Sequence, residues 1–567
     1  MIDLLDQDRG THEARLPHNS AIRRPVIGLL WGDFPWEASP HKVGKLLSTG
    51  VVARNVTRAL AASGTVVPFV APADPAAHPA VLRAFLQQID VLWADAYPGS
   101  AAALEVRQHE GLSCRAIVYA GGTLPKGVEA LLFPWQRLLR PGDGLLCTCQ
   151  ADLAIWRRLV RWSALREWMV PLAVDETVFH PRDVDQRLAT RRAHGLPPAA
   201  PLLLYVGRLN IQKNLHILLR LLAAVRRDVP EVHLCLVGEE DDIVLGEFGV
   251  RNTNYVQWLR GLAVDLDVAD AVTILAPLFG EDLAGLYAAS DVCVNTGFYH
   301  RENFGLAQAE AQACGVPVVC SAWGGFKDVV RPGETGYLID AVLTKHGVRV
   351  DWATGAAHVV ALLRDPALRA RMAAQAASWA HEQFSIAALA GRLATVVAEV
   401  TAPIPDTAIA TPAYEPSAFA RRYEAHKRAC GWYATAEERQ RTWDPPMFQG
   451  RDYALYETLL GPYATRLATD VPHSAIHLTW VPYYPSGVAL DPLRRVAEDH
   501  DPVWPHRRFL DPVEWEILRR VDGVATVGHV IDGVTVAGVA VDPPVCSMAL
   551  WRLAIEGFVL FQAGIEH

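Results

Sequence analysis

The strongest constraint on the fold of this chain is a pattern that occurs twice, in which short apolar segments alternate with segments of helical spacing. The first run starts at Pro25, where "PVIGLLWG" predicts a strand and "VVARNVTRALAAS" predicts a helix that Gly64 ends. The second run starts at residue 202 with "LLLYVG". Alternating strands and helices predict βαβ units on a parallel sheet, so the sequence predicts two α/β domains in series.

The second run is the more regular one. Its predicted helices cover residues 214–228, 281–289, 306–314 and 354–379, and apolar strands such as "VHLCLVG" and "GVPVVCS" lie between them. Two α/β domains joined by a linker leave a cleft between the carboxyl ends of their strands. Ligands of open α/β sheets bind at that edge.

The length of 567 residues exceeds what one compact core usually holds. The segment "RRAHGLPPAAP" separates the two runs, and "TAPIPDTAIATPAYEPS" follows the second as a linker. In chain order, the expected parts are a polar leader (1–20), an N-terminal α/β domain (21–185), a second α/β domain (195–400), a linker (401–420), a helical region of unknown role (421–504) and a C-terminal module (505–567).

Charge and cysteine content argue against several classes of protein. The net charge of −9 does not favour nucleic acid as a partner. Nine cysteines, an odd number without a C-x-x-C pair, indicate a reducing compartment. No apolar stretch is long enough for a transmembrane helix, and the first residues lack the pattern of a signal peptide. We therefore expect a cytoplasmic protein.

Two cations follow the first strand of the second domain. In "YVGRLNIQKN", Gly207 ends the strand, and Arg208 and Lys213 lead into a helix. Two fixed cations near a helix start form an anion clamp that suits a diphosphate. A pair of ordinary surface cations is the alternative.

Two glutamates flank a glycine turn in "RENFGLAQAEA". Gly305 lets the backbone approach a ligand closely, and free N–H groups at the helix start favour a phosphate. Glu302 precedes the helix and Glu310 lies within it, so their carboxylates reach different depths along one ligand. Ionised carboxylates only accept hydrogen bonds, so the hydroxyls of a sugar and a ribose are suitable partners. A helix-start acid and an ordinary helix glutamate are the alternative.

The order of "GRLNIQKN", "ENFGLAQAEA", "GVPVV", "GG" and "GETGYLI" resembles the retaining, nucleotide-sugar-dependent glycosyltransferases of the GT-B fold, and specifically their family 4. The resemblance covers about residues 25–400 and is strongest from 200 to 340. It implies an α/β fold in which two Rossmann-like domains face a cleft. It also implies a UDP- or GDP-linked sugar donor, retention of anomeric configuration, and no need for a metal ion or a separate cofactor.

The resemblance also implies roles for individual residues. Arg208 and Lys213 would hold and neutralise the departing diphosphate. Glu302 would contact hydroxyls of the transferred sugar, and Glu310 would bind the nucleotide ribose. The other donor-binding positions are Gly207, Asn303, Phe304, Gly305, Leu306 and Gly50. The segment "VDLDVAD" contains a D-x-D pair, but it precedes a strand instead of ending one, so we predict no metal site there.

The N-terminal half departs from the family pattern. Where relatives often have a Gly-Gly pair, this chain has only Gly50 with Gly44 nearby, and Asp95 and Ala120 stand where histidines are common. These departures leave the acceptor open between a sugar, a lipid-linked glycan, a peptide and a small molecule. Residues 156–170, "WRRLVRWSALREWMV", predict a basic, aromatic helix that either packs on the first domain or lies on an anionic membrane.

Residues 505–567 show the pattern of a helix, a short helix, a helix and "EGFVLF". This pattern is similar to the PqqD-like winged helices of ribosomal-peptide pathways, which implies docking of a peptide or protein acceptor. A packing or dimerisation module is the alternative. Residues 421–567 are therefore the candidate surface for a homodimer or a protein partner.

The sequence thus predicts a glycosyltransferase, with two rival functions. One rival is a GT-B phosphorylase, which would need a phosphate site in place of a nucleotide site, and Glu310 argues against it. The other is a non-catalytic scaffold with a transferase fold. A scaffold need not retain the full set of cations and carboxylates described above.

Overall fold

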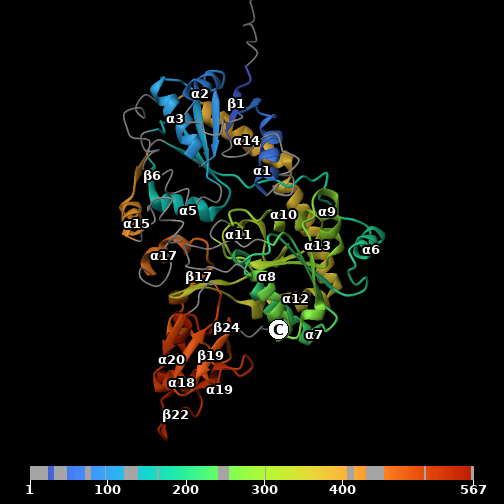
Figure 1. Ribbon diagram of the computed structural model, residues 1–567, viewed down its shortest axis with the longest axis vertical. Helices are drawn as coiled ribbons and strands as arrows, with labels where there is room; N and C mark the ends of the chain where they lie inside the picture. The colour runs from blue at the N-terminus through green and yellow to red at the C-terminus, as the bar shows by residue number, and fades with distance from the viewer. Residues whose placement is uncertain are drawn as a thin grey trace, which may run out of the picture.

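The computed structural model describes eleven segments of the chain (Figure 1). They are residues 23–30, 48–69, 78–95, 98–120, 138–162, 165–240, 254–299, 302–404, 414–429, 453–502 and 506–562. The predicted leader, 1–20, and part of the predicted linker lie outside them. None of the helices within these segments combines the length and the apolar character that crossing a membrane requires.

The first α/β domain is built on a six-stranded parallel sheet in the order β2-β1-β3-β4-β5-β7. The strands are β1 (Val26–Leu30), β2 (Thr65–Pro68), β3 (Val91–Asp95), β4 (Arg115–Tyr119), β5 (Gly144–Cys147) and β7 (Arg166–Met169). Among the described residues, the helices that accompany them are α1 (Ser48–Leu60), α2 (Pro79–Leu86), α3 (Pro98–His109) and α5 (Gln150–Leu159). The central strands are almost wholly buried, as in parallel sheets covered on both faces.

A buried ion pair ties α3 to this sheet. The Arg107 guanidinium donates to both carboxylate oxygens of Asp143, over 2.9 and 2.7 Å, and both side chains are fully buried. The guanidinium also donates to the carbonyls of Cys114 and Leu138, and Asp143 accepts from the N–H of Ala116. The pair thereby fixes the chain just before β5.

The second α/β domain repeats the arrangement, with a six-stranded parallel sheet in the order β10-β9-β8-β11-β12-β13. The strands are β8 (Leu202–Val206), β9 (His233–Val237), β10 (Val272–Leu275), β11 (Val292–Asn295), β12 (Val318–Ser321) and β13 (Gly336–Ile339). The helices are α6 (Val184–Ala193), the short 3-10 helix η4 (Ile211–Lys213), α7 (Leu215–Asp228), α8 (Tyr255–Asp265), η6 (Ala269–Ala271), α9 (Gly280–Ala289), α10 (Leu306–Ala313), α11 (Phe326–Val329), α12 (Trp352–Arg364) and α13 (Pro366–Phe384).

The predicted single helix over 354–379 is in fact two helices, α12 and α13. Pro366 has no N–H to continue the hydrogen-bond ladder of α12, so that helix ends before it. Asp365 then caps α13 by accepting from the N–H groups of Ala367 and Leu368. The apolar period alone did not reveal this break.

The prediction of a basic, aromatic helix over residues 156–170 was wrong. α5 ends at Leu159, and the chain continues as β6 (Val160–Trp162) and then as β7, the edge strand of the first sheet. β6 pairs antiparallel with β16 (Tyr414–Pro416), a partner far along the chain. This pairing satisfies the backbone in an extended form, so the helical alternatives, packed or membrane-bound, do not apply.

The helix α14 (Ile386–Thr401) leaves the second domain and packs on the first, beside α1, as Figure 1 shows in orange and blue. Its buried face consists of Leu389, Leu393, Val396, Val397 and Val400. On the other side of the contact, Val52 and Val56 of α1 are buried. The core of the first domain is therefore completed by residues that follow the second.

After α14 the chain contacts both α/β domains. β16 and α15 (Ala418–Ala429) lie against β6 and α5 of the first domain. After α17 (Tyr453–Leu460), β17 (Arg466–Leu467) adds to the hairpin β14 (Ala341–Thr344) and β15 (Gly347–Val350) of the second. This part of the chain thus bridges the two domains.

The C-terminal module has its own apolar core and begins before residue 505. Its elements are β18 (Val481–Tyr483), β19 (Val488–Asp491), β20 (Val496–Asp499), β21 (His506–Phe509), α18 (Pro512–Leu518), α19 (Val527–Ile531), β22 (Thr535–Val536), β23 (Val539–Ala540), α20 (Pro543–Glu556) and β24 (Leu560–Gln562). The prediction of a helical region over 421–504 was therefore wrong for its second half, where long-range strand pairs replace helices. The likeness to a PqqD-like winged helix stays a prediction.

Candidate active site

The turn after β8 depends on two glycines. Gly207 has φ +153°, and a Cβ on Gly238 would lie 1.8 Å from the Gly207 carbonyl oxygen, so the two backbones touch. Tyr205 donates from its phenol to the carbonyl of Arg208 over 3.1 Å, and the Arg208 guanidinium donates to Gln212 over 3.2 Å. The carboxyl end of β8 thereby presents the Arg208 cation on a rigid turn.

A second turn positions Lys213. Asn214 adopts the left-handed conformation, with φ 57° and ψ 35°, between η4 and α7. Its side chain donates to the carbonyl of Thr296 over 2.9 Å, and the Thr296 hydroxyl donates back to the Asn214 carbonyl over 2.9 Å. These bonds join the turn to the end of β11, where the next segment of the site begins.

Lys213 and Glu302 form an ion pair from Nζ to Oε1. Their side chains are 16% and 14% exposed, so the pair is partly reachable by a ligand. The pKa of the buried Tyr205 phenol is raised, mainly by burial; the Glu302 charge raises it further and the Arg208 charge opposes this. The Arg208 guanidinium bonds to Gln212, the residue before Lys213, so Arg208, Lys213 and Glu302 form one cluster.

Gly305 precedes α10 with φ +100°, a conformation that favours glycine. A Cβ there would lie 2.8 Å from the Phe326 ring. The Phe304 ring is buried against Phe384, with ring centroids 5.4 Å apart, so only its backbone is available to a ligand. Leu306 is the first residue of α10, and the N–H groups of the first helical turn have no acceptor within the helix ladder.

Glu310 differs from Glu302 in its surroundings. It is buried within α10, and Oε2 accepts a hydrogen bond from the Tyr287 phenol over 3.1 Å. Burial raises its pKa to about 8, and the Tyr287 bond opposes this only in part. At neutral pH the Glu310 carboxyl is therefore protonated, whereas the sequence argument treated both glutamates as ionised acceptors.

The structure does not join every predicted residue to this cluster. Gly50 is buried in the first turn of α1, in the other domain. Ala120 is buried directly after β4, and Asp95 ends β3. Asn303 instead links the domains, because its carbonyl accepts from the Thr148 hydroxyl over 3.0 Å.

The sequence analysis did not identify the residues that hold the backbone of Glu302 in place. Gly325 donates from its N–H to the Glu302 carbonyl over 3.0 Å, and a Cβ on Gly324 would lie 2.4 Å from the same oxygen. Trp323 is buried and donates from Nε1 to the carbonyl of Tyr299 over 2.8 Å. The "GG" pair at 324–325 was the only signal of this support in the sequence.

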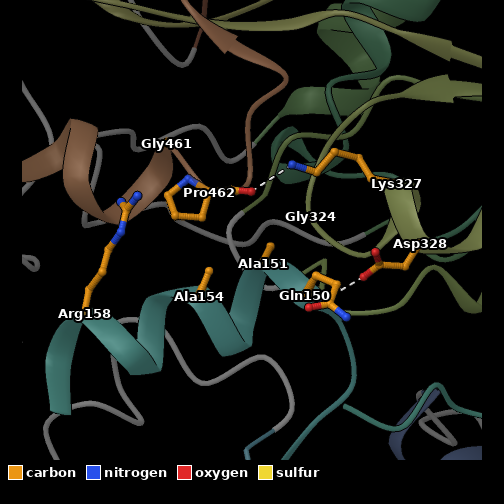
Figure 2. A pocket seen from close by; sticks show the side chains of 9 residues that line it. All are labelled: Gln150, Ala151, Ala154, Arg158, Gly324, Lys327, Asp328, Gly461 and Pro462. Carbon is orange, nitrogen blue, oxygen red and sulfur yellow. Dashed lines mark hydrogen bonds between the residues drawn. The ribbon is translucent and has the colours of Figure 1, made fainter. Parts of the chain in front are cut away.

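A cavity of about 310 Å³ lies beside these glycines, between α5 and α11 (Figure 2). It is lined by Gln150, Ala151, Ala154, Arg158, Gly324, Lys327, Asp328, Gly461 and Pro462. The Asp328 carboxylate accepts from the N–H of Gln150 over 2.8 Å, so the cavity lies where the two domains touch. In the part of the chain that the structure describes, no three His, Cys, Asp or Glu side chains gather as a metal site would require.

Residues 186–379 match the family model described as glycosyl transferases group 1. The match is confined to this segment, which holds most of the second α/β domain. It contains the whole Arg208, Lys213 and Glu302 cluster.

Curated proteins similar to this chain include D-inositol 3-phosphate glycosyltransferases. The protein of that name from Stackebrandtia nassauensis is 34% identical over 252 residues, which cover 43% of this chain and 53% of that protein. The one from Thermomonospora curvata is 39% identical over 217 residues, covering 37% and 46%. The chain thus spans about half the length of the curated relatives it matches.

Solved structures similar to this chain show its fold. Anabaena HepE in complex with UDP superposes with a TM-score of 0.51 and 16% identity, over 66% of this chain and 99% of that one. A glycosyltransferase from Rickettsia africae gives a TM-score of 0.50 and 11% identity, over 67% and 99%. The two parallel six-stranded sheets are therefore a GT-B arrangement, as the sequence predicted.

Proposed function

We propose that this chain is a retaining glycosyltransferase that moves a sugar from a UDP- or GDP-linked donor to an acceptor without a metal ion or a separate cofactor. The observation that carries the proposal is the ion pair of Lys213 and Glu302, next to the turn that carries Arg208, in the segment that matches the glycosyl transferases group 1 model. Cations next to a carboxylate suit a ligand in which a diphosphate adjoins sugar hydroxyls.

The ion pair suggests how the donor engages. A diphosphate carries more negative charge than one carboxylate, so it competes with Glu302 for the Lys213 ammonium, and Arg208 assists it. Glu302 is then free to accept hydrogen bonds from hydroxyls of the transferred sugar. The Gly305–Leu306 backbone at the start of α10 offers N–H groups to the phosphate.

Charge stabilisation by Arg208 and Lys213 would drive the transfer. When the bond between the anomeric carbon and the phosphate oxygen breaks, its electron pair stays on that oxygen, and the two cations stabilise the growing charge. The same oxygen takes the proton of the acceptor hydroxyl as the new glycosidic bond forms. Attack from the face that the phosphate leaves retains the anomeric configuration.

Glu310 would bind the ribose of the nucleotide. Because its carboxyl is protonated at neutral pH, it can donate one hydrogen bond and accept another, which suits the two hydroxyls of a ribose. Tyr287 holds the carboxyl in place from the other side.

The relatives suggest an acceptor, and the cysteines suggest a compartment. The relatives act by name on D-inositol 3-phosphate, which is therefore one acceptor to test, although the matches cover less than half of this chain. The cysteines among the described residues are free and buried, which supports a reducing cytoplasmic compartment.

The test is release of nucleotide diphosphate from a panel of UDP-, GDP- and ADP-sugars without added metal, with and without D-inositol 3-phosphate. A variant with both Glu302→Gln and Arg208→Ala is the control. Release that is lost in the variant supports the transferase. Release that requires inorganic phosphate in place of an acceptor would indicate a phosphorylase. Neither release nor donor binding by ligand-observed NMR would favour the scaffold.

A further inference from the structure

A short segment from the C-terminal part of the chain lies directly behind the Glu302 loop. We call residues 462–465, which follow α17, the strap. The Lys327 ammonium donates to the carbonyls of Pro462 and Ala464 over 2.8 and 2.9 Å, and Figure 2 shows the first of these bonds. The N–H of Gly324 donates to the Tyr463 carbonyl over 2.9 Å. The strap is thus hydrogen-bonded to Gly324, which follows β12, and to Lys327 of α11.

Tyr463 is the centre of the strap and is fully buried. Its ring stacks on Trp323, with centroids 5.6 Å apart and planes 25° apart. A Cβ on Gly324 would lie 2.9 Å from the Tyr463 ring, so the ring occupies the space that this glycine leaves. Trp323 donates to the Tyr299 carbonyl, and Gly325 donates to the Glu302 carbonyl. Because Tyr463 packs on Trp323 and Gly324, it supports the backbone that carries Glu302.

The Tyr463 hydroxyl reaches the other domain. It donates to Oδ1 of Asp152, a buried residue in the first turn of α5. The pKa of Tyr463 is raised by burial and by the Asp152 charge, so the phenol keeps its proton and acts as the donor. The neighbouring bonds from Thr148 to Asn303 and from Gln150 to Asp328 cross the same boundary. Tyr463 is therefore in contact with both sides of the domain junction.

We propose that Tyr463 is a positioning residue for sugar transfer, which holds the Glu302 loop against α5 and so fixes the two α/β domains in the arrangement that transfer requires. The inference rests on the proposed function. The charged groups assigned to the donor, Arg208, Lys213 and Glu302, lie in the second domain, whereas transfer needs an acceptor presented by the first. Loss of the Tyr463 link therefore lowers turnover and leaves nucleotide affinity unchanged.

The chain offers a matched control in Tyr483. Its phenol is also buried and also donates to a buried aspartate, Asp351, over 2.6 Å. That bond joins the C-terminal module to the second domain and does not involve the first. Tyr463→Phe and Tyr483→Phe each remove one buried hydroxyl, so they share any general loss of stability and differ in the link across the domains.

The experiment compares kcat, UDP affinity and the radius of gyration from small-angle X-ray scattering. For Tyr463→Phe we expect kcat to fall about tenfold or more. We expect the affinity for UDP to stay unchanged and the radius of gyration to increase. For Tyr483→Phe we expect wild-type values. Asp152→Asn keeps an acceptor oxygen for the phenol and should retain activity, whereas Asp152→Ala should behave like Tyr463→Phe.

The scattering separates the two proposals. If the wild-type protein transfers no sugar to any acceptor, the transferase proposal fails, and the radius of gyration still decides whether Tyr463 sets the arrangement of the domains. Equal kcat and equal radius of gyration for Tyr463→Phe and Tyr483→Phe would overturn the role of Tyr463.

Discussion

Glu310→Gln should change how the stability of the second domain depends on pH. Glu310 has a folded-state pKa of about 8 because it is buried, against an ordinary value of 4.5. Below pH 4.5 the carboxyl is protonated in both states. Between 4.5 and 8 only the folded state keeps the proton, so the free energy of unfolding falls by about 1.4 kcal/mol per pH unit as pH rises. By pH 7 the loss is about 3 kcal/mol.

Glutamine has the shape of the protonated carboxyl, and it can still accept the Tyr287 bond but cannot lose a proton. The variant should therefore gain stability relative to wild type by about 3 kcal/mol between pH 4.5 and 7. Native-state hydrogen exchange of the α10 amides, corrected for intrinsic rates, reports this free energy for one domain of a multi-domain chain. Glu231→Gln, an exposed site in the same domain, is the control. Parallel pH profiles for wild type and Glu310→Gln would refute the reasoning.

Three further predictions concern the site and its support. Lys213→Met should lower nucleotide release about 100- to 1000-fold, because it removes a cation from the departing diphosphate; an unchanged rate would contradict that role. Gly238→Ala should weaken UDP binding by about 1–3 kcal/mol in a calorimetric titration, since its Cβ would displace the Gly207 carbonyl, and wild-type affinity would show that the turn adapts. Arg107→Met should lower the free energy of unfolding by about 3–5 kcal/mol in denaturant titrations, because it leaves the Asp143 charge buried and unpaired. Adding Asp143→Leu should restore most of that loss, and no recovery would mean that packing of Arg107 dominates.

The sequence predicted the fold because the decisive information is local. Apolar segments of four or five residues, alternating with helical segments, identify both parallel sheets without any knowledge of distant contacts. The candidate site could also be proposed from the sequence, because its residues belong to two short segments. Gly207, Arg208 and Lys213 form one of them, and Glu302 to Glu310 form the other. Their assignment to donor binding remains a prediction.

The features that the sequence did not predict depend on partners far along the chain. β6 is extended because β16 pairs with it, and the local sequence "WRRLVRWSALREWMV" does not predict a pairing partner so far along the chain. Tyr463 belongs to a segment without a clear hydrophobic period. Its position beside the site follows from its contacts with Trp323 and Asp152, which only the structure shows. The burial of Glu310 is likewise a property of the packed domain, and it changes the protonation state that the residue type suggests.

The position of α14 has a consequence for how the protein is made. The first domain cannot cover Val52 and Val56 until Leu389 to Val400 have left the ribosome. The six-stranded sheet of the second domain and the helices that follow it, α12 and α13, are complete in sequence at Phe384, before α14 begins. Domains that are synthesised first usually fold first. In this chain the order should be reversed, and the nascent N-terminal half should be the part that requires a chaperone during synthesis.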